Sequence, residues 1–239
     1  MLRTLFIGLA MFATIPAFSQ GSGGDYEYSS EIIWGINKNT NGGLIGGFIL
    51  KYGRAVKDNY FETFGLELSN VKHPKEVRTQ SITGNSFIWG KQNYLYAIRL
   101  QYGREKILFR KAPQQGVQIN AFLAGGPTVG VVTPYYITVQ TSLIESTSVP
   151  FNPNVHTNRR SILGAGTLFQ GLGESQIKLG GNVKTGLNFE FGTFKRHVTG
   201  FEVGFMLEAF TEDIIIVPNA ENRNIYPSAF ITLFYGSRR

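Results

Sequence analysis

The sequence predicts an all-β protein, an eight-stranded antiparallel up-and-down β-barrel that crosses a membrane. After residue 28, apolar and polar residues alternate with a period of two, as in strands with one apolar and one polar face. The clearest segments, such as 177–192, reach the ~9–11 residues that a tilted strand needs to cross a bilayer, whereas soluble strands average ~5–6. Their apolar faces carry large aromatics and their opposite faces carry Gly and charges, which a soluble core would not accept.

The composition excludes several other classes of protein. The chain has 239 residues, of which 16% are charged, 13% are aromatic and 29 are Gly. An ordinary soluble domain has about 25% charged residues. Cys is absent, which removes disulfide scaffolds, thiol catalysis and Cys-based metal sites. The sequence has no run of 18 apolar residues, so it does not predict a helical membrane protein.

The first residues have the features of a secretory signal. A short basic start at Arg3 precedes the apolar stretch 5–18, which is shorter than the ~20 residues of a spanning helix. Small residues at Ala17 and Ser19 suit a signal-peptidase site. We therefore expect a signal peptide at 1–19 and one barrel domain at 20–239.

Eight segments have the strand pattern. They are 28–37, 43–54, 59–71, 92–104, 115–125, 176–192, 199–211 and 225–236. With the N-terminus in the periplasm, the outer connections are 38–42, 72–91, 126–175 and 212–224, and the periplasmic turns are 55–58, 105–114 and 193–198. Long outer loops and short inner turns are typical of outer-membrane barrels. Segment 126–137 is also able to extend the fifth strand above the membrane.

Turning the apolar faces outward places charged side chains in the lumen. The expected lumen charges are Lys51, Arg99, Lys178 and Lys184, with Glu31, Glu67, Glu190, Glu202 and Glu208. The interior of an eight-stranded barrel is only wide enough for its own side chains, and buried charges are tolerated when they are paired. This pattern favours a salt-bridged plug, with a narrow ion or proton path as the alternative. Glu105 and a group of basic residues that includes Arg238 are assigned to the periplasmic end.

The outer rim carries the candidate contact residues. The basic segment 72–78 contains His73, Lys75 and Arg78, which suit the phosphates of lipopolysaccharide. Ile214, Ile215 and Ile216 form an apolar run that either prolongs a hairpin or is an exposed patch for a partner protein. Outer-membrane lipids and protein partners are therefore expected, and nucleic acid is not.

Catalytic signals are weak. His73 follows Ser69 by four residues at the rim, where outer-membrane lipid esterases place a His near a Ser. A lipid-modifying enzyme with this rim His is thus an alternative, but the sequence predicts no catalytic residues, metal site or cofactor.

Several segments resemble the small outer-membrane β-barrel proteins of Bacteroidota, including the PorT-like group. They are the signal ending Phe18-Ser19-Gln20, the strand Phe64–Leu68, the segment from Gly125-Gly126-Pro127 to Pro134-Tyr135-Tyr136, and the last strand Phe230–Tyr235. The chain departs from the usual terminal aromatic, because Gly236-Ser237-Arg238-Arg239 follows Tyr235. The resemblance implies a structural barrel or an accessory subunit of an envelope machine for protein secretion or outer-membrane assembly, without enzymatic activity.

Overall fold

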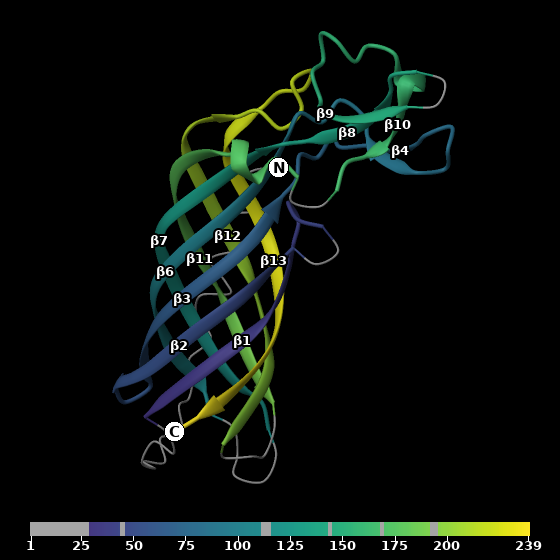
Figure 1. The fold of residues 1–239 in the computed structure, drawn as a ribbon. Coiled ribbons are helices and arrows are strands. Elements are labelled where there is room, and N and C mark those ends of the chain that lie inside the picture. The colour runs from purple at the N-terminus through teal and green to yellow at the C-terminus, as the bar shows by residue number, and fades with distance from the viewer. Residues whose placement is uncertain (1–28, 44–45, 111–115, 143–144, 168–169, 192–195) are drawn as a thin grey trace, which may run out of the picture.

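Eight long strands close into one barrel in the computed structural model, which describes residues 29–43, 46–110, 116–142, 145–167, 170–191 and 196–239 (Figure 1). The barrel strands are β1 (Ser30–Asn39), β2 (Gly47–Lys57), β3 (Tyr60–Val71), β6 (Asn93–Phe109), β7 (Gln118–Pro134), β11 (Gln176–Phe191), β12 (His197–Ile214) and β13 (Arg223–Arg238). Each pairs antiparallel with its neighbours, and β1 closes the ring by pairing with both β13 and β2. The predicted fold class is confirmed. The signal peptide expected at 1–19 lies outside the described residues.

Several strands are longer than the sequence pattern indicated. β6 runs to Phe109 instead of 104, β13 runs to Arg238 instead of 236, and β7 continues to Pro134 instead of 125. The extension of the fifth strand through 126–134 agrees with the second interpretation of that segment. At the lower end of β6, the outward Lys106 lies over the ring of Tyr60 on β3, 5.4 Å from its centroid. Charged side chains on the outer face therefore prolong the ladder where the sequence suggested a turn.

One end of the barrel carries additional structure from the long connections. Strands β4 (Arg78–Gln80) and β5 (Ser86–Ile88) form a hairpin, which we call the outer hairpin. Strands β8 (Tyr136–Gln140), β9 (Ser146–Pro150) and β10 (Ile162–Ala165) form a three-stranded sheet in the order β10-β8-β9, which we call the side sheet. It projects sideways from the barrel (Figure 1). We take this as the outer end, because outer-membrane barrels carry their longer connections on the cell exterior.

The side sheet has a hydrophobic core of its own. Phe87 of the outer hairpin packs there with Tyr135, Ile137, Phe151 and Ile162, all of which are buried. The expected outer connection 126–175 is therefore largely structured. The described helices are the short 3-10 turns η2 (Arg159–Ser161) and η3 (Leu172–Glu174). In the described part of the chain, no helix has the length and apolar character needed to cross a membrane.

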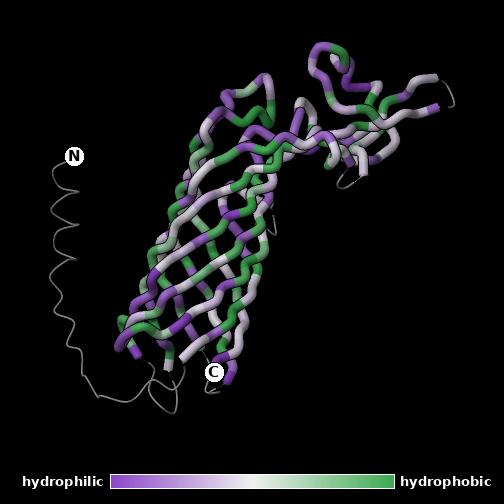
Figure 2. Tube along the Cα trace, turned by 60° about the vertical axis from the view of Figure 1, so that its left-hand side comes forward, coloured by the Kyte–Doolittle hydropathy of each residue, from purple (hydrophilic) through white to green (hydrophobic). Residues whose placement is uncertain are grey.

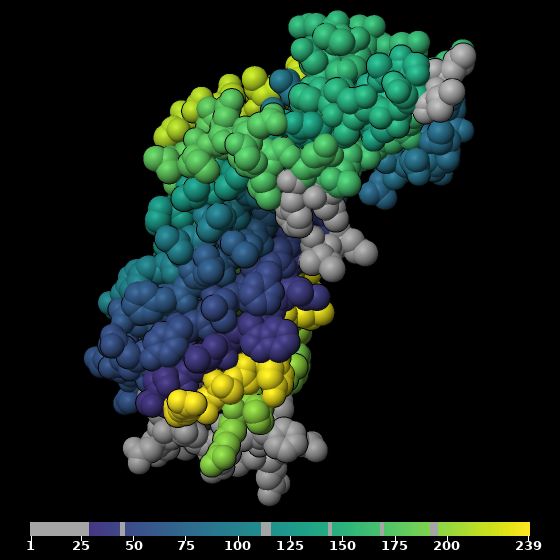
Figure 3. Space-filling model, in the orientation of Figure 1, coloured from purple at the N-terminus to yellow at the C-terminus, as the bar shows by residue number. Residues whose placement is uncertain are grey.

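The outer wall of the barrel is apolar, and the inner wall is polar. Phe205 on β12 is 71% exposed, and Trp34, Leu100 and Leu233 are about half exposed on three other strands. Apolar and polar residues alternate along the barrel strands (Figure 2), and Figure 3 shows the outer face of the barrel as a closely packed surface. A continuous surface of this kind is stable in lipid and not in water. The molecule is thus a transmembrane β-barrel of the kind held in the cell outer membrane.

Close approach of β11 and β12 depends on a facing pair of glycines. Gly186 and Gly204 are direct partners in the ladder. A Cβ atom on Gly204 would lie 2.7 Å from the Cα of Gly186 and would collide with the carbonyl oxygen of Thr185. Both contacts are with backbone, so no flexible side chain is able to move away.

Replacing Gly204 by Val should therefore destabilise the barrel by about 1–3 kcal/mol through overpacking. The measurement is the urea concentration at which an unboiled sample loses its fast-migrating, folded band on a gel. Gly173→Val is the matched control, because a Cβ at Gly173 meets no atom within 4 Å. Equal loss of stability in the two variants would contradict the role assigned to the glycine pair.

Candidate functional site in the lumen and at the outer end

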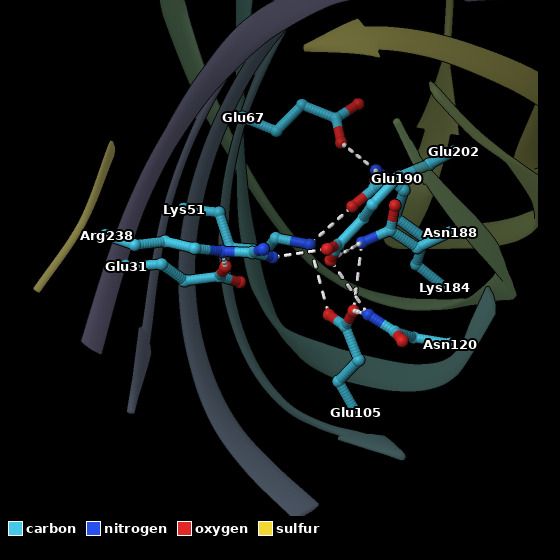
Figure 4. A network of polar contacts seen from close by, with 10 residues as sticks. All are labelled: Glu31, Lys51, Glu67, Glu105, Asn120, Lys184, Asn188, Glu190, Glu202 and Arg238. Carbon is cyan, nitrogen blue, oxygen red and sulfur yellow. Dashed lines mark hydrogen bonds and ion pairs between the residues drawn. The ribbon is translucent and has the colours of Figure 1, made fainter. Parts of the chain in front are cut away.

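The lower part of the lumen contains an arginine between two glutamates. Arg238, near the end of β13, binds Glu31 of β1 through Nε at 3.0 Å and Glu190 of β11 through its guanidinium. All three side chains are buried. Arg238 therefore connects the last strand to the first and to β11 (Figure 4).

A second cation lies beside this group. Lys51 of β2 binds Glu105 of β6 at 3.2 Å and Glu202 of β12 at 2.5 Å. Two buried amides complete the surroundings of Glu105, because Asn120 and Asn188 donate to its Oε1 at 2.7 and 2.9 Å. The same two amides also donate to Glu190, which joins this layer to the lower one (Figure 4).

The network continues toward the outer end. Lys184 of β11 lies 3.1 Å from Glu67 of β3 and 3.7 Å from Glu202. Arg99 of β6 forms a bidentate pair with Glu208 of β12, at 2.7 and 2.8 Å, and donates to Glu67 at 2.7 Å. Asn37 also donates to Glu67, at 3.2 Å.

Each cation of the network is held by two carboxylates. The members are the cations Lys51, Arg99, Lys184 and Arg238 and the carboxylates Glu31, Glu67, Glu105, Glu190, Glu202 and Glu208. Removing a charge from water costs several kcal/mol, which only close partners and further hydrogen bonds offset. The arrangement thus satisfies the condition under which charges persist inside a narrow barrel.

Apolar side chains fill the space around the network. Phe122, Met206 and Phe230 form one cluster within the barrel, and the ring of Phe230 lies 4.3 Å from Nζ of Lys184. The outer end holds a larger cluster, formed by Val71, Leu95, Ala97, Val132, Phe210, Ile214, Ile216, Val217 and Tyr226. The lumen cavity beside Lys51, Phe122 and Lys184 measures only about 20 Å³, which is room for one water molecule. Within the described residues, the lumen is a packed plug.

Most of the predicted lumen residues meet in this network, and Lys178 does not. Glu31, Lys51, Glu67, Arg99, Lys184, Glu190, Glu202 and Glu208 are all members. Lys178 instead pairs with Glu212 at 2.8 Å, where its side chain is 20% exposed. The alternation along β11 assigns its face correctly, but its position lies above the plug.

Two charged members were not recognised as lumen residues from the sequence. The sequence pattern places Glu105 and Arg238 at the periplasmic end, whereas the structure buries both inside the barrel. The signal that would have found them is the same alternation, extended past 104 in β6 and past 236 in β13. Asn120 and Asn188, which face inward on their strands, were not singled out either.

The rim candidates are not assembled for catalysis. Nδ1 of His73 accepts the backbone N–H of Lys75 at 3.1 Å, and Nε2 lies 3.1 Å from the carbonyl oxygen of Glu221. The hydroxyl of Ser69 donates to the carbonyl of Gly46 at 2.9 Å. His73 and Ser69 thus bind separate backbone groups. The described residues also contain no group of three or more His, Cys, Asp and Glu side chains suited to a metal ion.

The expected surface residues divide into exposed and buried ones. Lys75 and Arg78 are exposed, while His73 is buried. Ile214 and Ile216 are buried in the outer cluster, and only Ile215 is exposed. The interpretation of 214–216 as an apolar surface patch is therefore wrong for two of its three residues, because the chain turns back over the barrel mouth and buries them.

An ion pair that is separate from the network is buried outside the barrel, near the base of the side sheet. Nζ of Lys91 lies 2.7 Å from Glu76 and 4.3 Å from the ring centroid of Tyr94. The side chain of Lys91 has no exposed surface, and this burial lowers the pKa of its ammonium group although Glu76 acts in the opposite direction. The pair joins the connection between β3 and β4 to the connection between β5 and β6.

Comparison with known proteins gives a likeness of fold only. No family model and no curated protein matches the sequence. Among solved structures, the chain is similar to Neisserial surface protein A, with 11% identity over 91% of this chain and 100% of that one and a TM-score of 0.39. It is similar to Ail of Yersinia pestis, with 10% identity over 89% and 99% of the two chains and a TM-score of 0.40. The N-terminal β-barrel domain of Pseudomonas aeruginosa OprF has 9% identity over 89% and 98%, with a TM-score of 0.39.

Replacing Arg99 by Met should cost about 3–5 kcal/mol of folding free energy, because Glu67 and Glu208 would lose a buried partner. Lys178→Met is the matched control. It breaks a partly exposed pair that is worth at most about 1 kcal/mol. Urea unfolding, followed by the mobility of unboiled samples, measures both. The plug would not be the main stabilising element if the two variants unfolded at the same urea concentration.

Proposed function

We propose that this chain is a non-enzymatic outer-membrane barrel that acts as a structural or accessory subunit of an envelope complex. Protein secretion or outer-membrane assembly is the process that its resemblance to the PorT-like barrels of Bacteroidota suggests. The observation that carries the proposal is the packed lumen, because a barrel without an internal passage has only its outer surfaces available for function.

The plug argues against the alternative of a narrow channel. A path for ions needs a continuous row of sites that an ion enters and leaves easily. Here the charges are bound to one another, and the apolar cluster around Phe210 and Ile216 covers the outer side of the network. A proton or ion would have to break buried ion pairs and then cross this apolar layer.

The rim geometry argues against the lipid-modifying enzyme. A catalytic His needs a nucleophile or a water molecule within hydrogen-bond reach. Both ring nitrogens of His73 already contact backbone groups, and Ser69 donates elsewhere. This pair thus lacks the arrangement that activates a nucleophile.

The side sheet supports a role in protein contacts. Strand β9 pairs only with β8, so its other edge presents backbone groups that no strand of the described chain covers. Such an edge is a template for pairing with a strand from another chain. Its own hydrophobic core allows the side sheet to present this edge at a defined distance from the barrel.

Purification of the full chain from its native membrane in mild detergent should yield a partner protein in constant stoichiometry. Ser146→Lys with Thr147→Lys should reduce that co-elution, because lysines on an exposed strand edge oppose strand addition. Both residues are exposed on β9. Ser237→Lys at the opposite end of the barrel is the control and should co-elute as the wild type does. Elution of the barrel alone in several mild detergents would contradict the accessory role.

In planar lipid bilayers, the purified protein should produce no stable conductance steps at neutral pH, because the plug leaves only a water-sized cavity. A barrel that is folded by the gel-mobility criterion and nevertheless conducts in reproducible unit steps would favour the channel. Heat-denatured protein from the same preparation controls for contaminants and bilayer leakage.

A further inference from the structure

A polar cleft lies where the outer hairpin meets the segment that leads into β10. Its volume is about 540 Å³, and it is lined by Gln80, Ser81, Ile82, Asn158, Arg159 and Arg160. β4 and β10 lie close together at the free end of the side sheet (Figure 1). The cleft therefore joins two connections that are far apart in the sequence and belongs to the part of the molecule farthest from the plug.

Hydrogen bonds fix both walls of this cleft. The hydroxyls of Ser81 and Thr83 donate to the carbonyl of Leu163, at 2.8 and 2.9 Å, and so attach the hairpin turn to β10. On the other wall, Oδ1 of Asn158 accepts the backbone N–H of Arg160 at 3.0 Å. The lining residues thus stand on segments that are held by hydrogen bonds within the chain.

The cleft has an unbalanced positive charge. Its lining contains two guanidinium groups and no carboxylate. Within the described part of the chain, neither Arg159 nor Arg160 forms a salt bridge, and both are exposed. In the lumen, by contrast, every cation of the network is bound by two carboxylates. The two arginines are consequently available to an anion from outside.

The types of side chain indicate the chemistry of that anion. Guanidinium groups match the oxygens of a phosphate in a planar, two-point geometry. The amides of Gln80 and Asn158 suit the hydroxyls of a sugar, and Ile82, which is 72% exposed, offers an apolar contact to a sugar ring. The volume lies within the ~300–1,000 Å³ of small-molecule sites, which is enough for one or two sugar units.

We propose that this cleft binds a phosphorylated saccharide of lipopolysaccharide in the outer leaflet. The inference rests on the proposed outer-membrane barrel, whose outer end faces that leaflet. The side sheet projects sideways from this end, over the lipid that surrounds the barrel (Figure 1). A phosphorylated sugar headgroup beside the barrel is thus within reach of the cleft, and its charge is complementary to the two arginines.

The test uses the full chain, folded in detergent, and equilibrium binding of purified rough lipopolysaccharide. Arg159→Gln with Arg160→Gln should weaken binding at least about tenfold, which is the loss expected when two charge-assisted contacts are removed. Lys38→Gln with Arg223→Gln is the charge-matched control, because both residues are exposed toward the same end of the barrel and do not line the cleft. The control should keep the wild-type affinity within about twofold. Dephosphorylated lipopolysaccharide should bind the wild-type protein as weakly as intact lipopolysaccharide binds the Arg159→Gln, Arg160→Gln variant.

Three results would overturn the proposal. Equal losses in the two double variants would indicate diffuse attraction to a basic surface. Equal affinity of the wild type for intact and dephosphorylated lipopolysaccharide would show that phosphate is not the recognised group. Binding of inorganic phosphate alone with the same affinity would make this a site for a free anion. The fast-migrating band of unboiled protein and the co-elution of partners report on the barrel and its accessory role separately, so failure of the cleft is distinguishable from failure of the proposed function.

Discussion

Pairing of buried charges inside a closed eight-stranded barrel is the constraint on which the other features of this molecule depend. Several of the ion pairs join strands that share no backbone hydrogen bonds. Arg99 and Glu208 connect β6 with β12, Lys51 and Glu202 connect β2 with β12, and Lys184 and Glu67 connect β11 with β3. The backbone ladder holds each strand to its two neighbours, whereas the network holds opposite walls together. A variant that lacks one cation leaves two buried carboxylates without that ion-pair partner. The charges therefore stabilise the barrel together and not as independent pairs.

The network also explains why asparagines accompany the charges. It contains more carboxylates than cations, and each surplus acceptor needs a donor. Asn120 and Asn188 supply N–H groups to Glu105 and Glu190, and Asn37 supplies one to Glu67. Neutral donors bind a carboxylate without adding a further charge that would itself need a partner. The polar inner face is thus a mixture of amides and ions, and this mixture fills the lumen that a wider barrel would leave to water.

The inner face was predictable from the sequence because a strand has a side-chain period of two wherever it occurs. The alternation assigned Lys51, Glu67, Arg99 and Lys184 to the lumen without any knowledge of their partners. The position of a residue along the barrel axis was not predictable in this way, because it depends on the register between strands. Lys178 shares a face with Lys184 but lies beside the exposed Glu212 at the outer end. For the same reason the pattern identified inward charges but not which carboxylate each cation contacts.

Strand ends were less predictable than strand faces. Glu105 lies between the outward Arg104 and Lys106, and a run of three charges is typical of a turn in water. At the edge of a membrane, however, such basic side chains extend toward the headgroups while their stems stay on the barrel wall. The ladder therefore continues, and Glu105 remains inside. The burial of Arg238 was not indicated by the sequence for a related reason, because the polar residues after Tyr235 resemble a free terminus and not the end of a strand.

The apolar run at 214–217 illustrates what a one-dimensional pattern does not contain. An exposed patch and the lid of a hydrophobic core have the same composition, and the direction of the chain decides between them. Here the direction depends on one side chain. Asn222 accepts the backbone N–H groups of Ile216 and Val217 at 3.0 and 3.3 Å and donates to the carbonyls of Val217 and Ala220, both at 3.0 Å. These four bonds close a tight turn after β12, so Ile216 points back into the barrel mouth and packs with the outer cluster. Asn222, five residues beyond the run, thus converts a potential contact surface into part of the plug, and the side sheet and the cleft at its free end remain as surfaces for partners.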